Sequence, residues 1–435
     1  MNGLVSPVVS PAADRPISIR TIALASLVGT TIEWYDFFLY GTAAALVFNR
    51  LYFPTFDARV GTLAAFATYS VGFVARPLGG VIIGHFGDCI GRKAMLVLTM
   101  MIMGLATFCI GLLPTYESWG LWAAVALVVL RFAQGFGVGG EWGGAVLMAV
   151  EHAPDNARGF YDSWPQMGVP AGLILATAAF AVVSRLPEPQ FLAWGWRLPF
   201  LSSIVLVATG LLVRFRVSES PVFESLKHAR REFSVPVAEA VRRYPKEILL
   251  TMGMRMAENS GFYIFTVFVL AYATQVAGLS RQDTLDGVLL ASAGALIALP
   301  VCGAISDRIG RRPVYLFGAI TIAVFAFPFF WLIEIHSVRL LWVALIVPMV
   351  FGEAPMYGPQ AAFLAEMFGA GVRYSGASLG AQLASVFAGG LSPFIAAALL
   401  PYGGNAIAAY LLAMALITIV AVWLADETRH RRISG

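Results

Sequence analysis

The sequence predicts an all-α polytopic membrane protein, with twelve transmembrane helices in two pseudo-symmetric six-helix halves. Three observations support this fold class: the composition, the series of long apolar segments, and an internal repeat at half the chain length. Of the 435 residues, 59% are hydrophobic and only 12% are charged, and the mean hydropathy is +0.77. Soluble domains carry about 25% charged residues. This composition therefore excludes a soluble globular protein and a disordered chain.

The apolar segments define the spans, because a helix needs about 20 mainly apolar residues to cross a bilayer. The amino-terminal half has six such segments, at 21–48, 60–84, 93–113, 119–149, 158–184 and 197–214. The carboxy-terminal half has six more, at 246–275, 284–305, 313–333, 339–366, 374–400 and 404–425. The predicted organisation is a tail, a half, a linker, a second half and a tail: 1–20, 21–214, 215–245, 246–425 and 426–435.

The polar stretch 215–245 is broken by Pro221 and Pro236, and its pieces are amphipathic. We expect it to lie on the lipid headgroups as a linker, with a small regulatory domain as the alternative. The placement of basic residues predicts the orientation. With the amino terminus inside, 20 of the 29 Lys and Arg residues lie on the inner side and six on the outer side. Cytoplasmic loops carry this excess, so we expect the linker and both tails to be cytoplasmic.

The internal repeat is a loop that follows the second span of each half. Residues 84–93, GHFGDCIGRK, and residues 303–312, GAISDRIGRR, match at five positions with one constant offset of 219. Parallel repeats of this kind occur in transporters. An aspartate can meet a helix amino terminus, and arginines can pair with carboxylates, so the loop suits a latch that opens and closes. The predicted gating residues are Asp88, Arg92, Lys93, Asp307, Arg311 and Arg312.

Polar and ionisable residues within spans are costly and indicate function. Most of them lie on the first and fourth helices of each half, whereas Arg76 lies on the second span. Those on the first and fourth helices are Glu33, Asp36, Arg131, Gln134, Glu141, Arg255, Glu258, Asn259 and Glu353. Asp36 and Arg255 are related by the 219-residue offset, as are Gln134 and Glu353. Arginine binds carboxylates through its planar fork, and a cavity carboxylate can exchange a proton as an arginine approaches or leaves. This set therefore suits an organic anion carried together with a proton.

We assign two sets of residues on this basis. The predicted substrate-binding residues are Arg131, Gln134, Arg255 and Asn259, with the aromatic residues Trp34, Tyr263, Trp164 and Tyr357. The predicted proton-coupling residues are Asp36 first, then Glu33, Glu258 and Glu353. The alternative is that these charges form buried ion pairs that hold helices together. That alternative is strongest for Arg76 and Glu141, and Arg76 is also a candidate for the inner latch.

Several strings resemble a known family. The repeated loop is similar to the signature loop of the major facilitator superfamily. The first-span string TTIEWYDFFLYG (30–41) and the fourth-span string RFAQGFGVGGEWGGA (131–145) resemble the metabolite:proton symporter family within it. The strings at 158–172 and 255–268 resemble its shikimate-carrier branch. Cys89 stands in the first loop copy where the superfamily usually has arginine, which puts one latch contact in doubt.

The resemblance implies a carrier in the inner membrane of a bacterial cell, with spans one, four, seven and ten around a central cavity. We expect a proton-coupled symporter that imports a small organic acid, shikimate-like or another mono- or dicarboxylate, by alternating access. The alternative is a proton- or sodium-coupled symporter for proline or betaine. That branch carries a long carboxy-terminal coiled coil, whereas this chain ends about ten residues after its last predicted span. The arginines on the cavity helices favour anions over the lipophilic cations of a multidrug exporter.

Other functions find little support in the sequence. It contains no Walker loop, H-E-x-x-H or paired C-x-x-C motif, and its three cysteines are scattered, so we expect no cofactor and no metal. It shows no nucleophile–base constellation, so we expect no enzyme. The basic residues flank apolar segments, which indicates a bilayer and no nucleic acid. Gly135 and Gly139 are predicted to support close helix packing. We expect a monomer.

Overall fold

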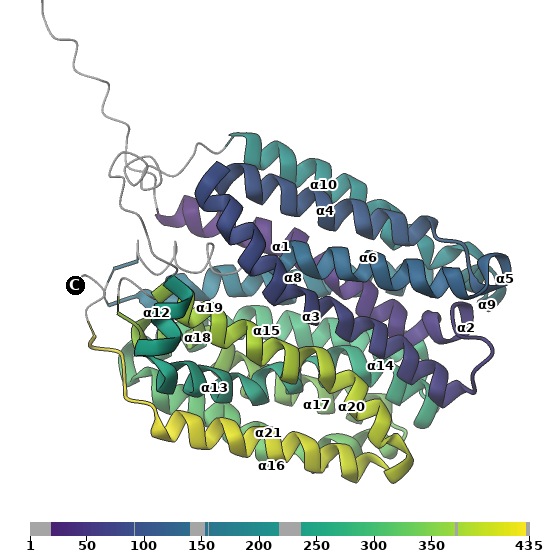
Figure 1. The fold of residues 1–435 in the computed structure, drawn as a ribbon. Helices are drawn as coiled ribbons and strands as arrows, with labels where there is room; N and C mark the ends of the chain where they lie inside the picture. Colours follow the sequence, from purple (N-terminus) through teal and green to yellow (C-terminus); the bar gives the residue numbers. More distant parts are fainter. Residues whose placement is uncertain are drawn as a thin grey trace, which may run out of the picture.

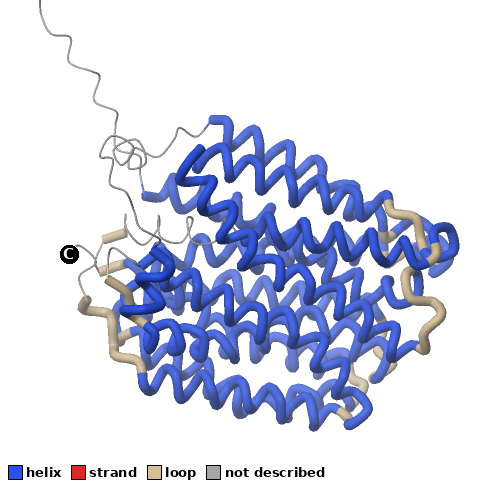
Figure 2. Tube along the Cα trace, in the orientation of Figure 1, coloured by secondary structure: helices blue, strands red, loops and turns tan. Residues whose placement is uncertain are grey.

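The computed structural model describes residues 19–90, 92–139, 153–154, 156–216, 236–369 and 373–431. Within these ranges the chain is helical apart from short connections, and the described residues include no strand (Figure 2). Continuous helices suit a membrane interior, because every backbone polar group in lipid needs a partner within its own segment.

The amino-terminal half is built from five helical rods and one irregular first rod. The first rod runs through α1 (Ile19–Ala43), η1 (Ala44–Phe48) and α2 (Asn49–Leu51). The others are α3 (Ala58–Ile90), α4 (Arg92–Leu112), α6 (Leu121–Gly139), α8 (Arg158–Val183) and α10 (Arg197–Arg216). Short pieces lie between them: α5 (Tyr116–Trp119), α9 (Glu188–Gln190) and η2 (Phe191–Gly195).

The carboxy-terminal half repeats this plan after the short α12 (Pro236–Arg243). Its first rod is α13 (Pro245–Tyr263), η3 (Ile264–Phe268), α14 (Val269–Ala271) and η4 (Tyr272–Val276). Three rods follow: α15 (Arg281–Ile309), α16 (Arg311–Glu334), and α17 (Val338–Val347) with η5 (Pro348–Glu353) and α18 (Ala354–Met367). The fifth rod consists of α19 (Arg373–Ala384), η6 (Ser385–Gly390), α20 (Leu391–Leu399) and η7 (Leu400–Tyr402). The sixth rod is α21 (Gly404–Leu424).

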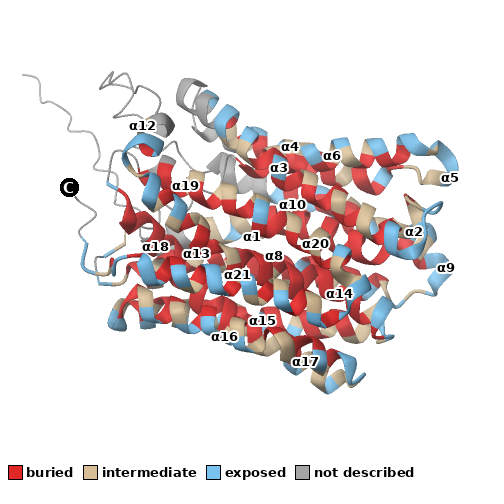
Figure 3. Cartoon of the chain, turned by 60° about the horizontal axis from the view of Figure 1, so that its bottom comes forward, coloured by how far each residue is buried: buried red, intermediate tan, exposed pale blue. Residues whose placement is uncertain are grey.

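The rods run side by side, with the connections gathered at the two ends (Figure 1). One end carries α12 and the carboxy terminus, and the other carries α2, α5 and α9. We call them the inner end and the outer end, following the orientation predicted from the basic residues. Buried residues run through the middle of the bundle, and exposed ones lie on the periphery and at the ends (Figure 3).

Nine helices of the described part are long and apolar enough to cross a membrane. A shorter apolar stretch, Val97–Leu112, lies in α4. The first helices of the two halves, α1 and α13, are not among the nine, and they carry buried ionisable side chains. The all-helical, many-span fold class predicted from composition is confirmed.

Irregularities in the two first rods also follow the repeat. Each rod contains a π-helical turn, Ala44–Phe48 in the first half and Ile264–Phe268 in the second, at nearly the offset of the sequence repeat. π-helical turns are rare and occur frequently at functional sites. The two helices are therefore distorted at matching levels, just beyond the residues that face the centre of the bundle.

Glycines bring α3 and α6 into close contact. A Cβ atom on Gly135 would lie 1.9 Å from the carbonyl oxygen of Gly72, and one on Gly139 would lie 1.9 Å from that of Arg76. Only glycine permits this approach, as predicted for Gly135 and Gly139. The seam fixes the depth at which Arg76 and Arg131 project from the two helices.

Candidate transport site

A small cavity lies between the two halves. Its free volume is about 30 Å³ for the centres of water-sized molecules, which is room for roughly two waters. The cavity is thus occluded, and a six-membered ring enters only if its walls move apart. The lining residues come from both halves: Glu33, Trp34, Arg76, Val138, Val169, Arg255, Glu258, Asn259, Phe262, Tyr263, Tyr357, Gln382 and Ser385.

Arg76 is the cation of the amino-terminal wall. Its side chain is buried at 4% exposure, and its Nε and Nη2 atoms have no hydrogen-bond partner among the described residues. The guanidinium carbon lies 4.4 Å from the ring centres of Phe37 and Phe73 and 5.2 Å from that of Trp34. These rings stabilise the positive charge through their faces. The fork itself is left available to a ligand in the cavity.

The carboxy-terminal wall is a connected polar network. Arg255 Nε donates to Glu258 Oε2 at 3.2 Å, and the Asn259 amide donates to the same oxygen at 3.0 Å. From the fourth helix of this half, Gln360 Nε2 donates to that oxygen at 3.1 Å and to the Tyr315 hydroxyl at 2.9 Å. The network holds Arg255, Glu258 and Asn259 together at the cavity, as their helical spacing predicted.

Arg131 lies behind the cavity. It is fully buried, and its guanidinium carbon lies 4.0 Å from the ring centre of Phe37 and 4.6 Å from that of Tyr69. Its Nη1 donates to Gln134 at 3.1 Å. Gly72 makes this position possible, since a Cβ there would lie 2.5 Å from Arg131 Nε. Arg131 and Gln134 are therefore absent from the cavity lining, in contrast to the position that we expected for them.

Asp36 also lies behind the cavity, outside its lining. It is 2% exposed, its Oδ1 has no partner among the described residues, and Thr107 lies beside its carboxyl group. Gln134 Nε2 donates to the Thr107 hydroxyl at 2.7 Å. A polar relay thus connects Asp36 through Thr107 and Gln134 to Arg131. Glu33, one helical turn from Asp36, lines the cavity itself.

Two further predicted residues occupy other positions. Both oxygens of Glu353 are buried without a hydrogen-bond partner among the described residues, and one would lie 2.8 Å from a Cβ on Gly261. Glu353 therefore packs behind α13, outside the lining. Trp164 lies in α8 against Phe160, with ring centres 6.0 Å apart, and also outside the lining. Trp34, Tyr263 and Tyr357 line the cavity.

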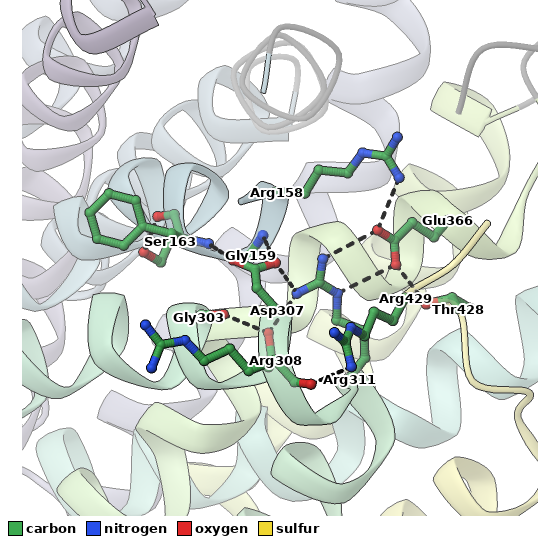
Figure 4. Close-up of polar contacts among 12 residues, drawn as sticks. Arg158, Gly159, Ser163, Gly303, Asp307, Arg308, Arg311, Glu366, Thr428 and Arg429 are labelled. Atoms are coloured by element: carbon green, nitrogen blue, oxygen red, sulfur yellow. Dashed lines mark hydrogen bonds and ion pairs between the residues drawn. The ribbon is translucent and has the colours of Figure 1, made fainter. Parts of the chain in front are cut away.

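The second loop copy forms an inner latch between the halves (Figure 4). Asp307, at the end of α15, accepts hydrogen bonds of 2.9 Å from the backbone N–H groups of Gly159 and Phe160, at the start of α8. Arg311 donates to Asp307 at 2.7 Å and reaches Glu366 of α18 at 3.4 Å. Arg311 and Glu366 are almost fully buried. The carboxylate at the helix start and the buried ion pairs hold the inner end closed.

The carboxy-terminal segment covers this latch. Glu427 accepts from the backbone N–H groups of Arg311 at 2.9 Å and Arg312 at 3.0 Å, which caps the start of α16. Arg312 in turn donates to the carbonyl oxygens of Val422 and Trp423. Between α15 and α16, Gly310 adopts φ 111°, which favours glycine. The predicted first latch copy, with Asp88, Arg92 and Lys93, lies outside the described side chains, as does Glu141.

An outer bridge between the halves stands at the opposite end. Glu188 of α9 contacts Arg50 at 2.6 Å and Arg281, at the start of α15, at 3.1 Å. Arg281 also stacks on Phe191, with its guanidinium carbon 3.9 Å from the ring centre. Nearby, the Thr62 hydroxyl donates to Gln275 at 3.1 Å. Contacts between the two halves are therefore present at both ends of the described structure.

Sequence reasoning missed part of this site. Gln382 and Ser385 line the cavity from the eleventh helix. The 219-residue offset pairs them with Ser163 and Gln166 of the fifth span, so two matched polar positions were a signal within an otherwise apolar segment. The latch role of Glu366, the last residue of the predicted span 339–366, was also missed. Its partner Arg311 lies 55 residues away in the sequence, so no local motif connects the two.

Two six-helix halves around a closed polar cavity, with ionic contacts at both ends, define a transporter of the major facilitator fold. The xylose transporter XylE from E. coli, solved in a partially occluded inward open conformation, matches with a TM-score of 0.75. The match is 17% identical in sequence and covers 95% of this chain and 99% of that chain. At this identity the likeness shows the fold alone.

Residues 21–434 match the family model of sugar (and other) transporters, and the chain belongs to that family. It is 47% identical to the shikimate transporter of E. coli (strain K12), over 94% of this chain and 95% of that protein. The inner membrane metabolite transport protein YhjE of the same strain is 40% identical, over 96% and 97%. The proline/betaine transporter of E. coli (strain K12) is 34% identical, over 97% of this chain and 88% of that protein. The protein is thus a multi-pass metabolite transporter of the major facilitator superfamily, as its motifs predicted, and not an enzyme.

Proposed function

We propose that the protein is a proton-coupled symporter that imports a small hydroxylated carboxylate, of the shikimate class, by alternating access across the inner membrane. The observation that carries this proposal is Arg76. A buried guanidinium with two unpartnered nitrogens in a cavity wall is costly unless an anion pairs with it. A carboxylate supplies that charge, and the arginine fork matches its two oxygens.

The charges of the lining support coupling to a proton. Arg255 is paired with Glu258, which leaves Arg76 and Glu33 as the other two charged residues of the lining. With Glu33 protonated, the cavity carries one excess positive charge and favours a carboxylate. Binding of the anion then favours protonation, and protonation favours the anion, because the two equilibria are linked. Asp36 lies one turn from Glu33 on the same helix, so the two carboxyl groups are tested side by side.

The remaining polar lining suits hydroxyl groups. Asn259, Gln382, Ser385, Tyr263 and Tyr357 present amides and hydroxyls that donate and accept hydrogen bonds. A purely apolar acid would leave several of these groups unpaired, which costs free energy in a closed cavity. The lining therefore favours a ring that carries both a carboxylate and hydroxyls over an aromatic acid.

The proline/betaine alternative finds less support in the cavity. Quaternary ammonium groups bind on aromatic faces. The faces of Trp34, Phe37 and Phe73 are already occupied by Arg76. The osmolyte branch remains an explicit outcome of the substrate test below.

Uptake by right-side-out vesicles tests the proposal, with labelled shikimate, a dicarboxylate, an aromatic acid and betaine as the panel. We expect shikimate to accumulate at low external pH and a protonophore to abolish accumulation. Arg76→Lys keeps the charge but loses the fork, and we expect uptake at low concentration to fall at least tenfold. Arg197→Lys, which alters an arginine bound to the carbonyls of Gly111 and Leu113, is the matched control. Preference for betaine, or normal affinity in Arg76→Lys, contradicts the proposal.

The proton site is tested separately. Glu33→Gln and Asp36→Asn resemble the protonated forms, so they should exchange substrate in counterflow yet fail to concentrate it against a gradient. We expect Glu33→Gln to have the larger effect on substrate affinity, because only Glu33 lines the cavity. If both variants still accumulate substrate in proportion to the pH gradient, Glu258 or Glu353 carries the proton.

A further inference from the structure

Asp162 is a buried carboxyl group at the inner latch that the sequence analysis did not select. It lies in α8, one turn from the backbone N–H groups that Asp307 binds. Its side chain is 0% exposed, and neither oxygen has a hydrogen-bond partner among the described residues. The main chain of α18 at Ala362 lies beside it. Such a group is costly to bury as an anion.

Charged side chains surround it from four helices, α8 itself, α15, α16 and α18: Arg158, Asp307, Arg311 and Glu366. Two positive and two negative charges balance in that set. Asp307 and Glu366 already occupy Arg311, and Arg158 lies 3.6 Å from Glu366. Among the described residues, the carboxyl group of Asp162 is therefore a third acid beside four charges that balance, and it has no hydrogen-bonded cation.

No other packed helix supplies that cation in the described residues. The first helix, α1, packs along α8, with Thr30 against Gly168. Its described charged side chains nearest this level are Glu33 and Asp36, which are acids and lie farther along the helix. α10 presents no described charged side chain at this end. Within the described residues, a proton is the cation that completes the cluster.

We propose that Asp162 is a proton-binding site of the inner latch, protonated while the latch is closed and deprotonated when it opens. Opening separates α8 from α15 and α18, because the contacts of Asp307 and Glu366 with α8 span the two halves. Water then reaches Asp162, its O–H bond breaks, and the proton passes to cytoplasmic water. A more alkaline cytoplasm favours the open latch, since the closed state binds the extra proton. This inference extends the proposed coupling but does not depend on it.

Accessibility of the latch tests the inference without substrate or gradient. Cys89, Cys109 and Cys302 are replaced by serine, and Ser163→Cys places one thiol in the buried contact, where Ser163 Cβ lies 3.2 Å from a Cβ on Gly303. Maleimide labelling is followed in inverted membrane vesicles between about pH 5.5 and 8.5. The rate is divided by that of the same protein with Asp162→Asn, which cancels the pH dependence of the thiol.

We expect this ratio to be near one in acid and to rise at least fivefold in alkali, because only the parent protein loses the proton. Glu239→Gln, which removes a partly exposed carboxylate of α12 at the same end, should keep the pH dependence of the parent. Asp162→Ser provides a second uncharged variant if the asparagine protein is not monodisperse. A flat ratio with both variants overturns the inference. Failure of shikimate accumulation with a rising ratio overturns only the proposed symport.

Discussion

The two contacts that close the cavity differ in depth. At the inner latch, Arg158 and Glu366 come from opposite halves and have side-chain exposures of 4% and 0%, and Asp307 caps a helix of the opposite half. At the outer bridge, the pair that joins the two halves is Arg281 and Glu188, whose side chains are 20% and 49% exposed. Removing one partner of a buried pair costs about 3–5 kcal/mol, whereas an exposed pair contributes about 0–1 kcal/mol. Among the described contacts, those at the inner end are the more deeply buried, so we expect opening outward to be the easier movement.

The largest effect is expected from Glu366→Gln. The change leaves Arg311 and Arg158 short of a carboxylate in a buried site, which weakens the closed latch by about 3–5 kcal/mol. Labelling of the single thiol in the Ser163→Cys background should accelerate strongly, and accumulation of substrate should fail. A labelling rate equal to that of the parent would show that the buried pair does not hold the latch.

The next effect is expected from Gly303→Val, because α8 and α15 meet at two glycines. A Cβ on Gly303 would lie 2.3 Å from the carbonyl oxygen of Gly159. Overpacking at such a contact costs about 1–3 kcal/mol. In the Ser163→Cys background, the variant should fold and bind substrate from the outer face, while the thiol at position 163 becomes accessible from the inner end. Gly278→Val, at an open turn with φ 64°, controls for a strained glycine away from the latch.

A smaller effect is expected from Glu427→Ala, which removes the acceptor of two N–H groups at the start of α16. Loss of a helix cap costs about 1 kcal/mol. Thermal unfolding should occur a few degrees lower, and latch labelling should rise only slightly. Glu427→Gln keeps a side-chain carbonyl acceptor and should recover part of the loss.

The smallest effect is expected from Glu188→Gln at the outer bridge. Glu188 and Arg50 are exposed and Arg281 is partly exposed, so the change should weaken outer closure by only about 1 kcal/mol, and salt should reduce the difference further. The apparent substrate affinity in low and high salt measures it. A loss as large as that of Glu366→Gln would reverse the comparison between the two ends.

The helices, the repeat and one latch could be predicted because their signals can be read in the sequence itself, as apolar segment length, a constant 219-residue offset and a short loop motif. The spacing of Arg255, Glu258 and Asn259 places them on one face, and the structure finds that face at the cavity. The same logic chose Arg131 over Arg76. Periodicity identifies a face but not the neighbour that covers it, and here Gly72 lets α3, with Tyr69, cover Arg131. No pattern in the sequence indicated Asp162 for the same reason, since most of the charged side chains around it come from other helices.

The π-helical turns change the direction in which side chains of the first rods point. Each turn adds one residue to its helix, which rotates everything beyond it by about 100° relative to an uninterrupted α-helix. Glu33 lies before Ala44–Phe48 and faces the cavity, whereas Arg50 lies after it and faces Glu188. One rod thus presents two independently oriented faces. Deleting a single residue within that turn would rotate Arg50 away from the bridge while Glu33 kept its direction.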